Sequence, residues 1–341
     1  MDSYNYTLKH RNYSLDLIRC IAIIFVICIH SMGALEATII SSSIFNTNRI
    51  VYIFLSSFIH MGVPLFTMLS GALLLNKHDE LGYFLKRRFK RIIIPFFIWS
   101  IIVFTLDKVT THQPSSFILS INEFITKFLT NGVHGIYWYI YMLIGLYLLT
   151  PLLQKIFKDI SSSLLHYLIL LLTLLIIIQY TLPSTYTEKI LLLKYLFPYL
   201  IYLGYYIYGY YFYRHVSKLF HFQRITILGF LIFYILGILN KILPFTTFPL
   251  YFFQSLFFFG ILISLKKETS PNNNTLITFI SNTSYGIYLS HFLFISFMYK
   301  IGVQQAIPLY IGPIFITLAV LCLELCLQYG IRYLKLEKLL Q

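Results

Sequence analysis

Three ionisable residues, Asp16, Arg19 and His30, lie within the first apolar run of the chain, residues 13–32. A charged side chain near the middle of a membrane helix costs about 2.5 to 3.5 kcal/mol, so each group needs a partner or a hydrated cavity. Arg19 and His30 are eleven residues apart. They therefore share one helix face, about 16 Å apart along the axis, and Asp16 is close enough to neutralise Arg19.

His30 is the candidate catalyst of this stripe. Imidazole has a pKa near neutrality, so it can take a proton from a hydroxyl or carry an acyl group. The alternative is a hydrogen-bonded histidine with a purely structural role. The shared helix face with Arg19 and Asp16 favours the chemical role over that alternative.

A second cluster, the basic segment KRRFKR of residues 86–91, leads directly into a later apolar run. If the helix extends back through this segment, Arg87 and Arg91 lie one turn apart on one face, with Arg88 beside them. Guanidinium groups bind oxyanions bidentately, so this spacing suits a phosphate-bearing donor. The alternative is ordinary topology charge that contacts acidic lipid.

Further polar side chains lie at membrane depth and are candidates to line a cavity. They are His60, Ser70, Trp138, Tyr288 and His291. For each of these histidines taken singly, the sequence favours a structural hydrogen bond over a catalytic role. The four cysteines sit inside apolar runs without a C-x-x-C pair, and no Cys/His cluster has metal spacing, so we expect neither a disulfide framework nor a metal.

The elements that must position these residues are membrane helices. Hydrophobic residues make up 58% of the 341 residues and charged residues 11%, which predicts an all-α polytopic membrane protein, a bundle of about ten transmembrane helices. No cleavage site follows the first apolar run, so we expect it to remain as a span. The predicted spans are residues 15–35, 50–75, 92–107, 136–154, 163–181, 195–213, 225–241, 246–265, 276–299 and 307–330.

The distribution of Lys and Arg predicts the orientation. A cytoplasmic N-terminus puts 18 of these residues in inner loops and 7 in outer loops, so both termini are expected to be cytoplasmic. Loop charge of this kind explains the net charge of +14 without a nucleic-acid partner. In the longest outer loop, residues 117–129 alternate apolar and polar side chains with helical spacing, which predicts an amphipathic helix on the outer interface.

Five motifs in order give the chain a resemblance to the integral-membrane acyltransferase family 3, the bacterial membrane O-acyltransferases of surface sugars. They are LDLIR at 15–19 followed by His30, GVPLF at 62–66 with LSG at 69–71, FLKRRFKRIIIP at 84–95, YWYIYMLIGLY at 137–147, and SYGIYLSH at 284–291. The chain departs from the family in one place. Many members have a histidine next to the fourth-span tryptophan, whereas here Ile136 and Tyr137 precede Trp138, and His134 lies upstream.

The resemblance implies a single transmembrane acyltransferase domain over residues 1–341, without an appended soluble domain, in a bacterial cytoplasmic (inner) membrane. It implies acyl-CoA, usually acetyl-CoA, as donor substrate rather than a bound cofactor, and a carbohydrate hydroxyl as acceptor, with membrane lipids as the other partners. Arg87, Arg88 and Arg91 would then hold the donor phosphates. His30 would be the general base or the acyl carrier, with Arg19 positioning the donor or stabilising the oxyanion.

Two other interpretations fit the same pattern. Ionisable residues at depth in ten spans also suit a proton-coupled secondary transporter or a polysaccharide exporter. However, the sequence lacks a paired set of helices broken by Gly or Pro in its two halves. A catalytically idle component of a polysaccharide assembly complex would keep the spans but tolerate substitution of Arg19 and His30.

Overall fold

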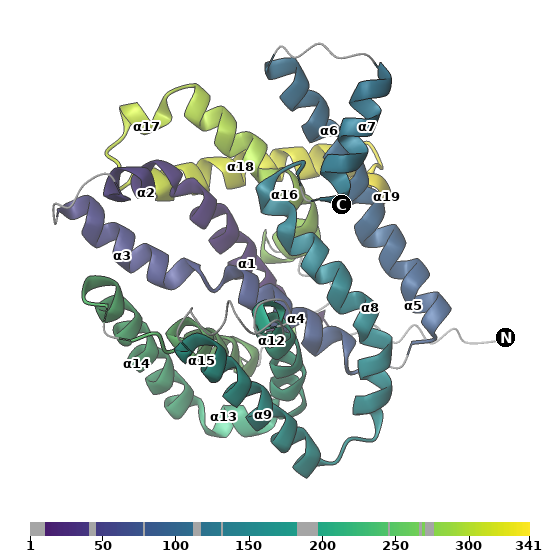
Figure 1. The fold of residues 1–341 in the computed structure, drawn as a ribbon, viewed down its shortest axis with the longest axis vertical. Helices are drawn as coiled ribbons and strands as arrows, with labels where there is room; N and C mark the ends of the chain where they lie inside the picture. The colour runs from purple at the N-terminus through teal and green to yellow at the C-terminus, as the bar shows by residue number, and fades with distance from the viewer. Residues whose placement is uncertain are drawn as a thin grey trace.

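The computed structural model describes residues 11–40, 46–77, 79–111, 117–130, 132–182, 197–244, 246–265, 268–269 and 276–341. These residues form a helical bundle (Figure 1). Within those ranges the only strands are β1 (Arg11–Asn12) and β2 (Glu268–Thr269), which pair with each other in antiparallel register. The prediction of an all-α protein is therefore confirmed.

Helices occupy all ten of the predicted spans. They are α1 (Tyr13–Ser31), α3 (Thr47–Ile59) with α4 (Gly62–Leu74), α6 (Ile94–Thr110), α8 (Trp138–Lys158), α9 (Ser162–Thr181), α12 (Phe197–Arg214), α14 (Gln223–Ile242), α15 (Leu250–Ser264), α16 (Leu276–Lys300) and α18 (Gly312–Tyr333). The connecting helices are α2 (Gly33–Ile40), α5 (Leu81–Arg88), α7 (Phe117–Leu129), α13 (Val216–His221), α17 (Val303–Ala306) and α19 (Glu337–Leu340). Two short helices of other types are also present. The π-helix η1 (Phe89–Ile93) joins α5 to α6, and the 3₁₀-helix η2 (Gly135–Tyr137) precedes α8.

Seven helical stretches of the described chain are long and apolar enough to cross a bilayer, which makes this a multi-pass membrane protein. They are Tyr13–Ser31, Thr47–Leu74, Leu81–Thr110, Gly135–Lys158, Ser162–Thr181, Gln223–Ile242 and Gly312–Tyr333. Helix α15 is apolar but has 15 residues, while α12 and α16 are richer in tyrosine, serine and threonine. The count of ten spans and the orientation of the termini therefore stay predictions.

Helix α1 is the central element of the bundle and packs against α16, α4, α18 and α15. Its N-terminus is capped by Asn12, whose side chain accepts a hydrogen bond from the backbone N–H of Ser14. Ile18, Ala22 and Ile27 are completely buried. Most of α1 is buried inside the bundle, so the polar side chains that it carries are held against neighbouring helices.

Two glycines set the closest approach in the bundle, between α4 and α12. A β-carbon on Gly71 would lie 1.7 Å from the carbonyl oxygen of Tyr206, and one on Gly209 would lie 1.8 Å from the carbonyl oxygen of Met68. Small residues allow membrane helices to pack backbone against backbone. This contact fixes the end of α4 that leads to the basic segment.

The amphipathic helix predicted in the longest outer loop is α7. It packs against the far end of α6, and the two stand together at the upper right of Figure 1. Lys108 of α6 forms an ion pair with Glu123 at 2.5 Å, and Lys127 forms a second at 3.0 Å. These ion pairs lower the pKa of the Glu123 carboxyl below its usual value, because both ammonium groups stabilise the carboxylate.

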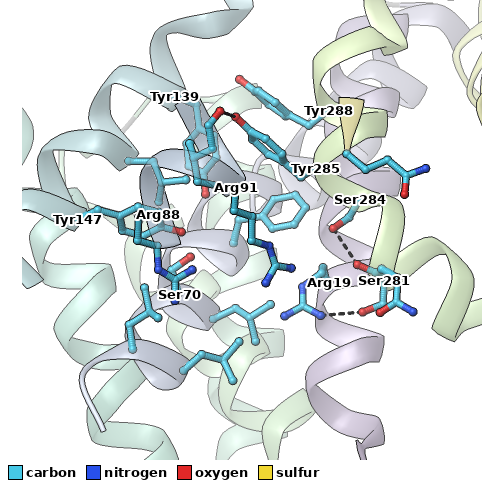
Figure 2. A pocket seen from close by; sticks show the side chains of 18 of the residues that line it. Arg19, Ser70, Arg88, Arg91, Tyr139, Tyr147, Ser281, Ser284, Tyr285 and Tyr288 are labelled. Atoms are coloured by element: carbon cyan, nitrogen blue, oxygen red, sulfur yellow. Dashed lines mark hydrogen bonds between the residues drawn. The ribbon is translucent and has the colours of Figure 1, made fainter. Parts of the chain in front are cut away.

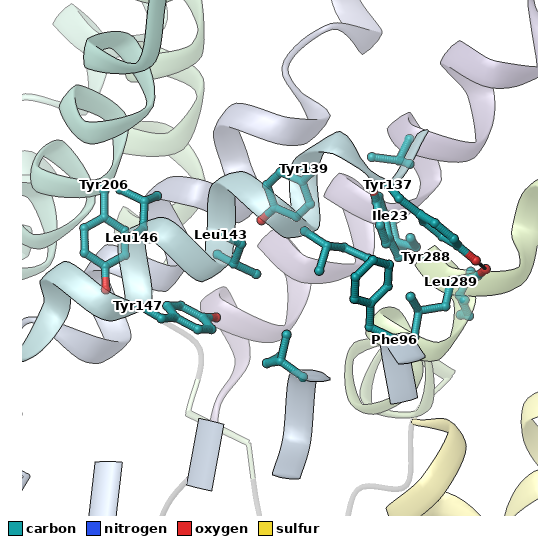
Figure 3. Close-up of a cluster of buried hydrophobic side chains, with 14 of the residues drawn as sticks. Ile23, Phe96, Tyr137, Tyr139, Leu143, Leu146, Tyr147, Tyr206, Tyr288 and Leu289 are labelled. Carbon is teal, nitrogen blue, oxygen red and sulfur yellow. Dashed lines mark hydrogen bonds between the residues drawn. The ribbon is translucent and has the colours of Figure 1, made fainter. Parts of the chain in front are cut away.

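The aromatic motif of the fourth predicted span forms a buried core next to α1 (Figure 3). Tyr137 and Tyr139 of this segment pack with Phe96 of α6 and Tyr288 of α16. The Tyr137 hydroxyl donates a hydrogen bond to the carbonyl oxygen of Leu289 at 3.0 Å. These contacts hold α6, α8 and α16 together beside α1.

Candidate active site

The basic segment continues into α6 through the π-helix η1, so that Leu81–Thr110 is one helical stretch. Single π-turns occur frequently at functional sites. Arg87 and Arg91 line a cavity inside the bundle, whereas Lys86 and Lys90 line an apolar groove on another face of the same stretch. Arg88 borders both spaces. The segment thus turns its arginines toward the cavity and its two lysines, Lys86 and Lys90, away from it.

The cavity has a volume of about 200 Å³ and lies between α1, α4, the α5–η1 stretch, α8 and α16 (Figure 2). Five cationic side chains are part of its lining. They are Arg19, Lys77, Arg87, Arg88 and Arg91. The rest of the polar lining consists of hydroxyl groups and two amides, from Ser70, Tyr139, Tyr147, Ser281, Ser284, Tyr285, Tyr288, Asn282 and Gln341. Such a concentration of positive charge suits a ligand with several negative charges.

Arg88 is held between two aromatic rings. Its guanidinium carbon lies 5.3 Å from the ring centre of Phe84 and 5.3 Å from that of Tyr147. Figure 2 shows the guanidinium groups of Arg88, Arg91 and Arg19 facing the same space from three directions. Guanidinium groups from α5, η1 and α1 therefore border one space.

Arg19 is fixed by a polar triad with Asp16 and Ser281. The guanidinium donates to the Ser281 hydroxyl at 2.7 Å, and this hydroxyl donates to the Asp16 carboxylate at 2.6 Å. Asp16 also forms the ion pair with Arg19 expected from their spacing, at 3.4 Å. The Asp16 side chain is 8% exposed and that of Arg19 is 25% exposed. The carboxylate is therefore the buried anchor, and the guanidinium reaches the cavity.

His30 lies at the other end of the α1 stripe, next to His291 of α16. The two ring centres are 5.4 Å apart and the rings are tilted by 37°. The ring of His134 stacks on Phe292 at 3.9 Å, beside His291 on α16. Because Arg19 contacts Ser281 and His30 contacts His291, the predicted single face of α1 points at α16 along its length, and the two helices run in the same direction.

Tyr288 stands where the cavity ends. Its ring lines the cavity, lies 5.8 Å from the ring of His291, and is held by a hydrogen bond from its hydroxyl to the carbonyl oxygen of Ile136 at 2.5 Å. His30 is not part of the cavity lining. Arg19 and His30 therefore face one helix, but in this conformation only the arginine borders the cavity, and the histidine pair lies beyond Tyr288.

The other candidate cavity residues fall in three places. Ser70 and Tyr288 line the cavity. Trp138 is 38% exposed and lines a separate groove of about 820 Å³ between α8 and α12, with its ring 5.5 Å from that of Tyr202. His60 hydrogen-bonds the carbonyl oxygen of Ser56, and its ring lies against Tyr251, away from His30. The structure thus brings Ser70 and Tyr288 to the arginines but not Trp138 or His60.

Three cavity-lining residues of α16, Ser281, Ser284 and Tyr285, were missed from the sequence, whereas Tyr288 was a candidate cavity residue. Ser281 joins Asp16 and Arg19 across more than 260 residues of chain. Ser281, Ser284, Tyr285 and Tyr288 all line the cavity. Their spacing of three and four residues continues to His291, so a polar stripe on the ninth predicted span was the signal available in the sequence.

A buried carboxyl, Glu324 of α18, has a structural role. The Ser290 hydroxyl donates to both of its oxygens, at 2.7 and 2.9 Å, and the Gln328 amide donates to one at 3.2 Å. These bonds join α16 to α18. Among the residues described, no group of three or more His, Cys, Asp or Glu side chains is placed to hold a metal ion.

Comparison with known families matches residues 12–331 to acyltransferase family 3, under the description "Acyltransferase domain". The chain belongs to this family. The match runs from the cap of α1 to the end of α18 and so includes the basic segment, both histidines of the pair and Tyr288. The protein is a membrane acyltransferase. Comparisons with curated proteins and with solved structures gave no match.

Proposed function

We propose that this acyltransferase moves an acyl group, specifically acetyl, from acyl-coenzyme A to a hydroxyl of a cell-surface or lipid-linked carbohydrate. The observation that carries the proposal is the cavity with five cationic side chains at the end of the bundle where α4 leads into α5. The Lys and Arg distribution assigns this end to the cytoplasm, where acyl-coenzyme A is made. We place the protein in a bacterial inner membrane, with ten spans and both termini cytoplasmic.

The donor fits the cavity by charge. Coenzyme A carries its phosphates at one end and its thioester at the other end of a flexible arm. Arg87 and Arg91 bind the phosphates, since guanidinium groups pair with phosphate oxygens bidentately. Arg88 is pre-positioned by its two aromatic neighbours and so loses less freedom on binding. The arm then leads the thioester from the cavity towards Tyr288.

Arg19 acts on the donor rather than at the reacting carbonyl. It lies about 16 Å from His30 along α1, as the helical rise over eleven residues requires. An oxyanion donor must lie within hydrogen-bond distance of the oxygen on which charge develops. We therefore assign the positioning of the donor to Arg19 and the chemistry to His30, and the side chain of Tyr288 must shift for the thioester to reach His30.

In the transfer reaction His30 acts as the general base. The imidazole takes the proton of the acceptor hydroxyl while the hydroxyl oxygen attacks the thioester carbonyl. A carbon–oxygen bond forms, the carbon–sulfur bond breaks, and the proton passes from His30 to the leaving thiolate. In the alternative, His30 attacks the thioester first and then gives the acyl group to the hydroxyl. Ping-pong kinetics would identify the second route.

The test is transfer of labelled acetyl groups by purified protein in liposomes, with a glycan acceptor supplied. Arg87→Gln and Arg91→Gln should each raise the KM for acetyl-CoA at least about tenfold, because each removes a charged hydrogen bond worth about 1.5 kcal/mol. Lys86→Gln and Lys90→Gln are matched controls, because they remove the same charge from another face of the same stretch. Equal KM changes in both pairs would contradict the donor site.

His30→Ala should abolish transfer and leave the folded protein intact. Undiminished transfer by this variant would remove His30 as the catalyst. An absence of transfer by the unaltered protein would agree with an idle membrane component. Solute flux across the liposome membrane without loss of thioester would instead support the secondary transporter or exporter.

A further inference from the structure

His291 has an unused hydrogen-bonding atom in the interior of the bundle. Its side chain is completely buried, and within the described residues its Nε2 has no hydrogen-bond partner. Buried polar atoms are nearly always paired, and an unpaired one is frequently part of a catalytic arrangement. His291 lies on α16 one helical step beyond Tyr288, so this atom is next to the end of the donor cavity.

The protonation of the ring follows from the other nitrogen. Nδ1 of His291 is 2.8 Å from the carbonyl oxygen of Tyr288 and 3.2 Å from that of Ile287. Carbonyl oxygens only accept hydrogen bonds, so the hydrogen of the neutral ring is on Nδ1 and Nε2 keeps a lone pair. Since Nδ1 faces the backbone of its own helix, Nε2 is an acceptor that points away from that helix.

His30 is the neighbour that can use this acceptor. Of the rings around His291, Tyr288 has its hydroxyl engaged with the carbonyl oxygen of Ile136, and Phe292 has no polar atom. The ring of His30, on α1, is the nearest of the three, with its centre 5.4 Å away. Catalytic hydrogen bonds are often long in a free enzyme and tighten when substrate binds.

We propose that His291 is the positioning residue of the transfer reaction: its Nε2 accepts the N–H of His30 and leaves the other nitrogen of His30 free to act as base. The inference rests on the proposed function. A nucleophile or base in such a site is usually oriented by a third group, which in serine hydrolases is a carboxylate. A neutral imidazole serves the same purpose here without placing an unpaired negative charge in the apolar interior.

The proton balance follows from this arrangement. The acceptor hydroxyl gives its proton to the free nitrogen of His30, which becomes an imidazolium. Its second N–H stays bonded to His291 Nε2, whose lone pair stabilises the positive charge. The first proton then leaves with the thiolate of coenzyme A, and both rings return to their starting forms.

The experiment compares His291→Leu with His291→Gln in the liposome transfer assay. Leucine fills the space but has no acceptor. It should lower kcat about 10- to 100-fold, because a hydrogen bond to a charged group is lost, and it should leave the KM for acetyl-CoA unchanged. Glutamine reaches as far as Nε2 and carries an amide oxygen. The kcat of His291→Gln should therefore be at least about tenfold higher than that of His291→Leu. His221→Leu is the control, because His221 on α13 bonds a carbonyl oxygen of its own helix in the same way and is not part of the cavity lining.

Each result is decisive. Full kcat in His291→Leu, or a raised KM with normal kcat, overturns the assignment, as does a glutamine variant no better than the leucine one. Nitrogen-15 NMR spectra of histidine-labelled protein provide a test that does not depend on activity. They should show one tautomer of His30 in the unaltered protein and a mixture of both tautomers in His291→Leu. If the unaltered protein transfers no acetyl, the proposed function itself fails; if it transfers acetyl, His30→Ala is inactive and His291→Leu is normal, the positioning role alone fails.

Discussion

Replacing Asp16 by Asn tests whether the triad on α1 positions the donor. The change removes one negative charge and keeps the shape, and the remaining amide oxygen still accepts from the Ser281 hydroxyl. What is lost is the ionic partner of Arg19, at 3.4 Å. Arg19 keeps its bond to Ser281 at 2.7 Å, so the guanidinium stays near its place but is held less firmly.

The magnitude follows from the burial of the pair. An exposed ion pair is worth about 0 to 1 kcal/mol, and a hydrogen bond to a charged group about 1.5 to 3 kcal/mol. The Asp16 side chain is 8% exposed and that of Arg19 is 25% exposed. We therefore expect a loss of about 2 kcal/mol in donor binding, or about 30-fold in kcat/KM, carried mainly by KM.

The assay is the transfer of labelled acetyl groups in liposomes, with the acetyl-CoA concentration varied. The matched control is Glu36→Gln, which removes the same charge from the exposed carboxylate of α2, where it accepts a hydrogen bond from Tyr52 at 3.1 Å. Asp16→Asn combined with Ser281→Ala should lose less than the sum of the two single changes, because both act on Arg19. Normal kcat/KM in Asp16→Asn, or the same loss in Glu36→Gln, would refute the reasoning.

Three further predictions concern the fold and its orientation. Gly71→Ala places a β-carbon 1.7 Å from a carbonyl oxygen of α12 and should destabilise the protein by at least about 1 to 3 kcal/mol, seen as a lower melting temperature, whereas Gly145→Ala meets no atom within 4 Å and should not. In a cysteine-free background, Lys90→Cys should react with an impermeant thiol reagent in inverted vesicles and Lys127→Cys in right-side-out ones; the reverse pattern contradicts the orientation. The lowered pKa of Glu123 means that its ion pairs stabilise α7 above the ordinary pKa of 4.5 and fail as pH falls through the lower folded-state value, so amide exchange in α7 should rise there, but not in Glu123→Gln.

Helical periodicity predicted the parts of the site that lie on one element. The spacing of Asp16, Arg19 and His30 placed all three on one face of α1, and this face does point at a single neighbouring helix, α16. The spacing of Arg87 and Arg91 likewise placed both on one face, and both line the cavity. In each case the residues are within a few turns of one another, so the geometry of one helix determines their relation.

Contacts between distant elements were not predictable in the same way. Ser281 completes the triad from α16, and which helix lies against α1 depends on how ten apolar segments pack. Depth in the membrane suggested that His60 and His291 belong together with His30, but depth does not fix the position around the bundle. His60 lies against Tyr251, and His291 lies against His30. The position of Tyr288 at the end of the cavity also depends on how the helices pack, so it was not predictable from helical spacing.

The separation of charge from the histidine pair has a physical reason. Cations and phosphates are costly to move into a medium of low dielectric constant, so in the proposed mechanism the donor's phosphates stay with the arginines at the hydrated end. The uncharged thioester and the flexible arm can enter the apolar interior at little cost. A catalyst at that depth must itself be neutral at rest, which an imidazole is and a carboxylate is not. In the proposed mechanism, the distance between Arg19 and His30 therefore allows one bundle to bind the polyanionic end of the donor at one place and to react its neutral end at another.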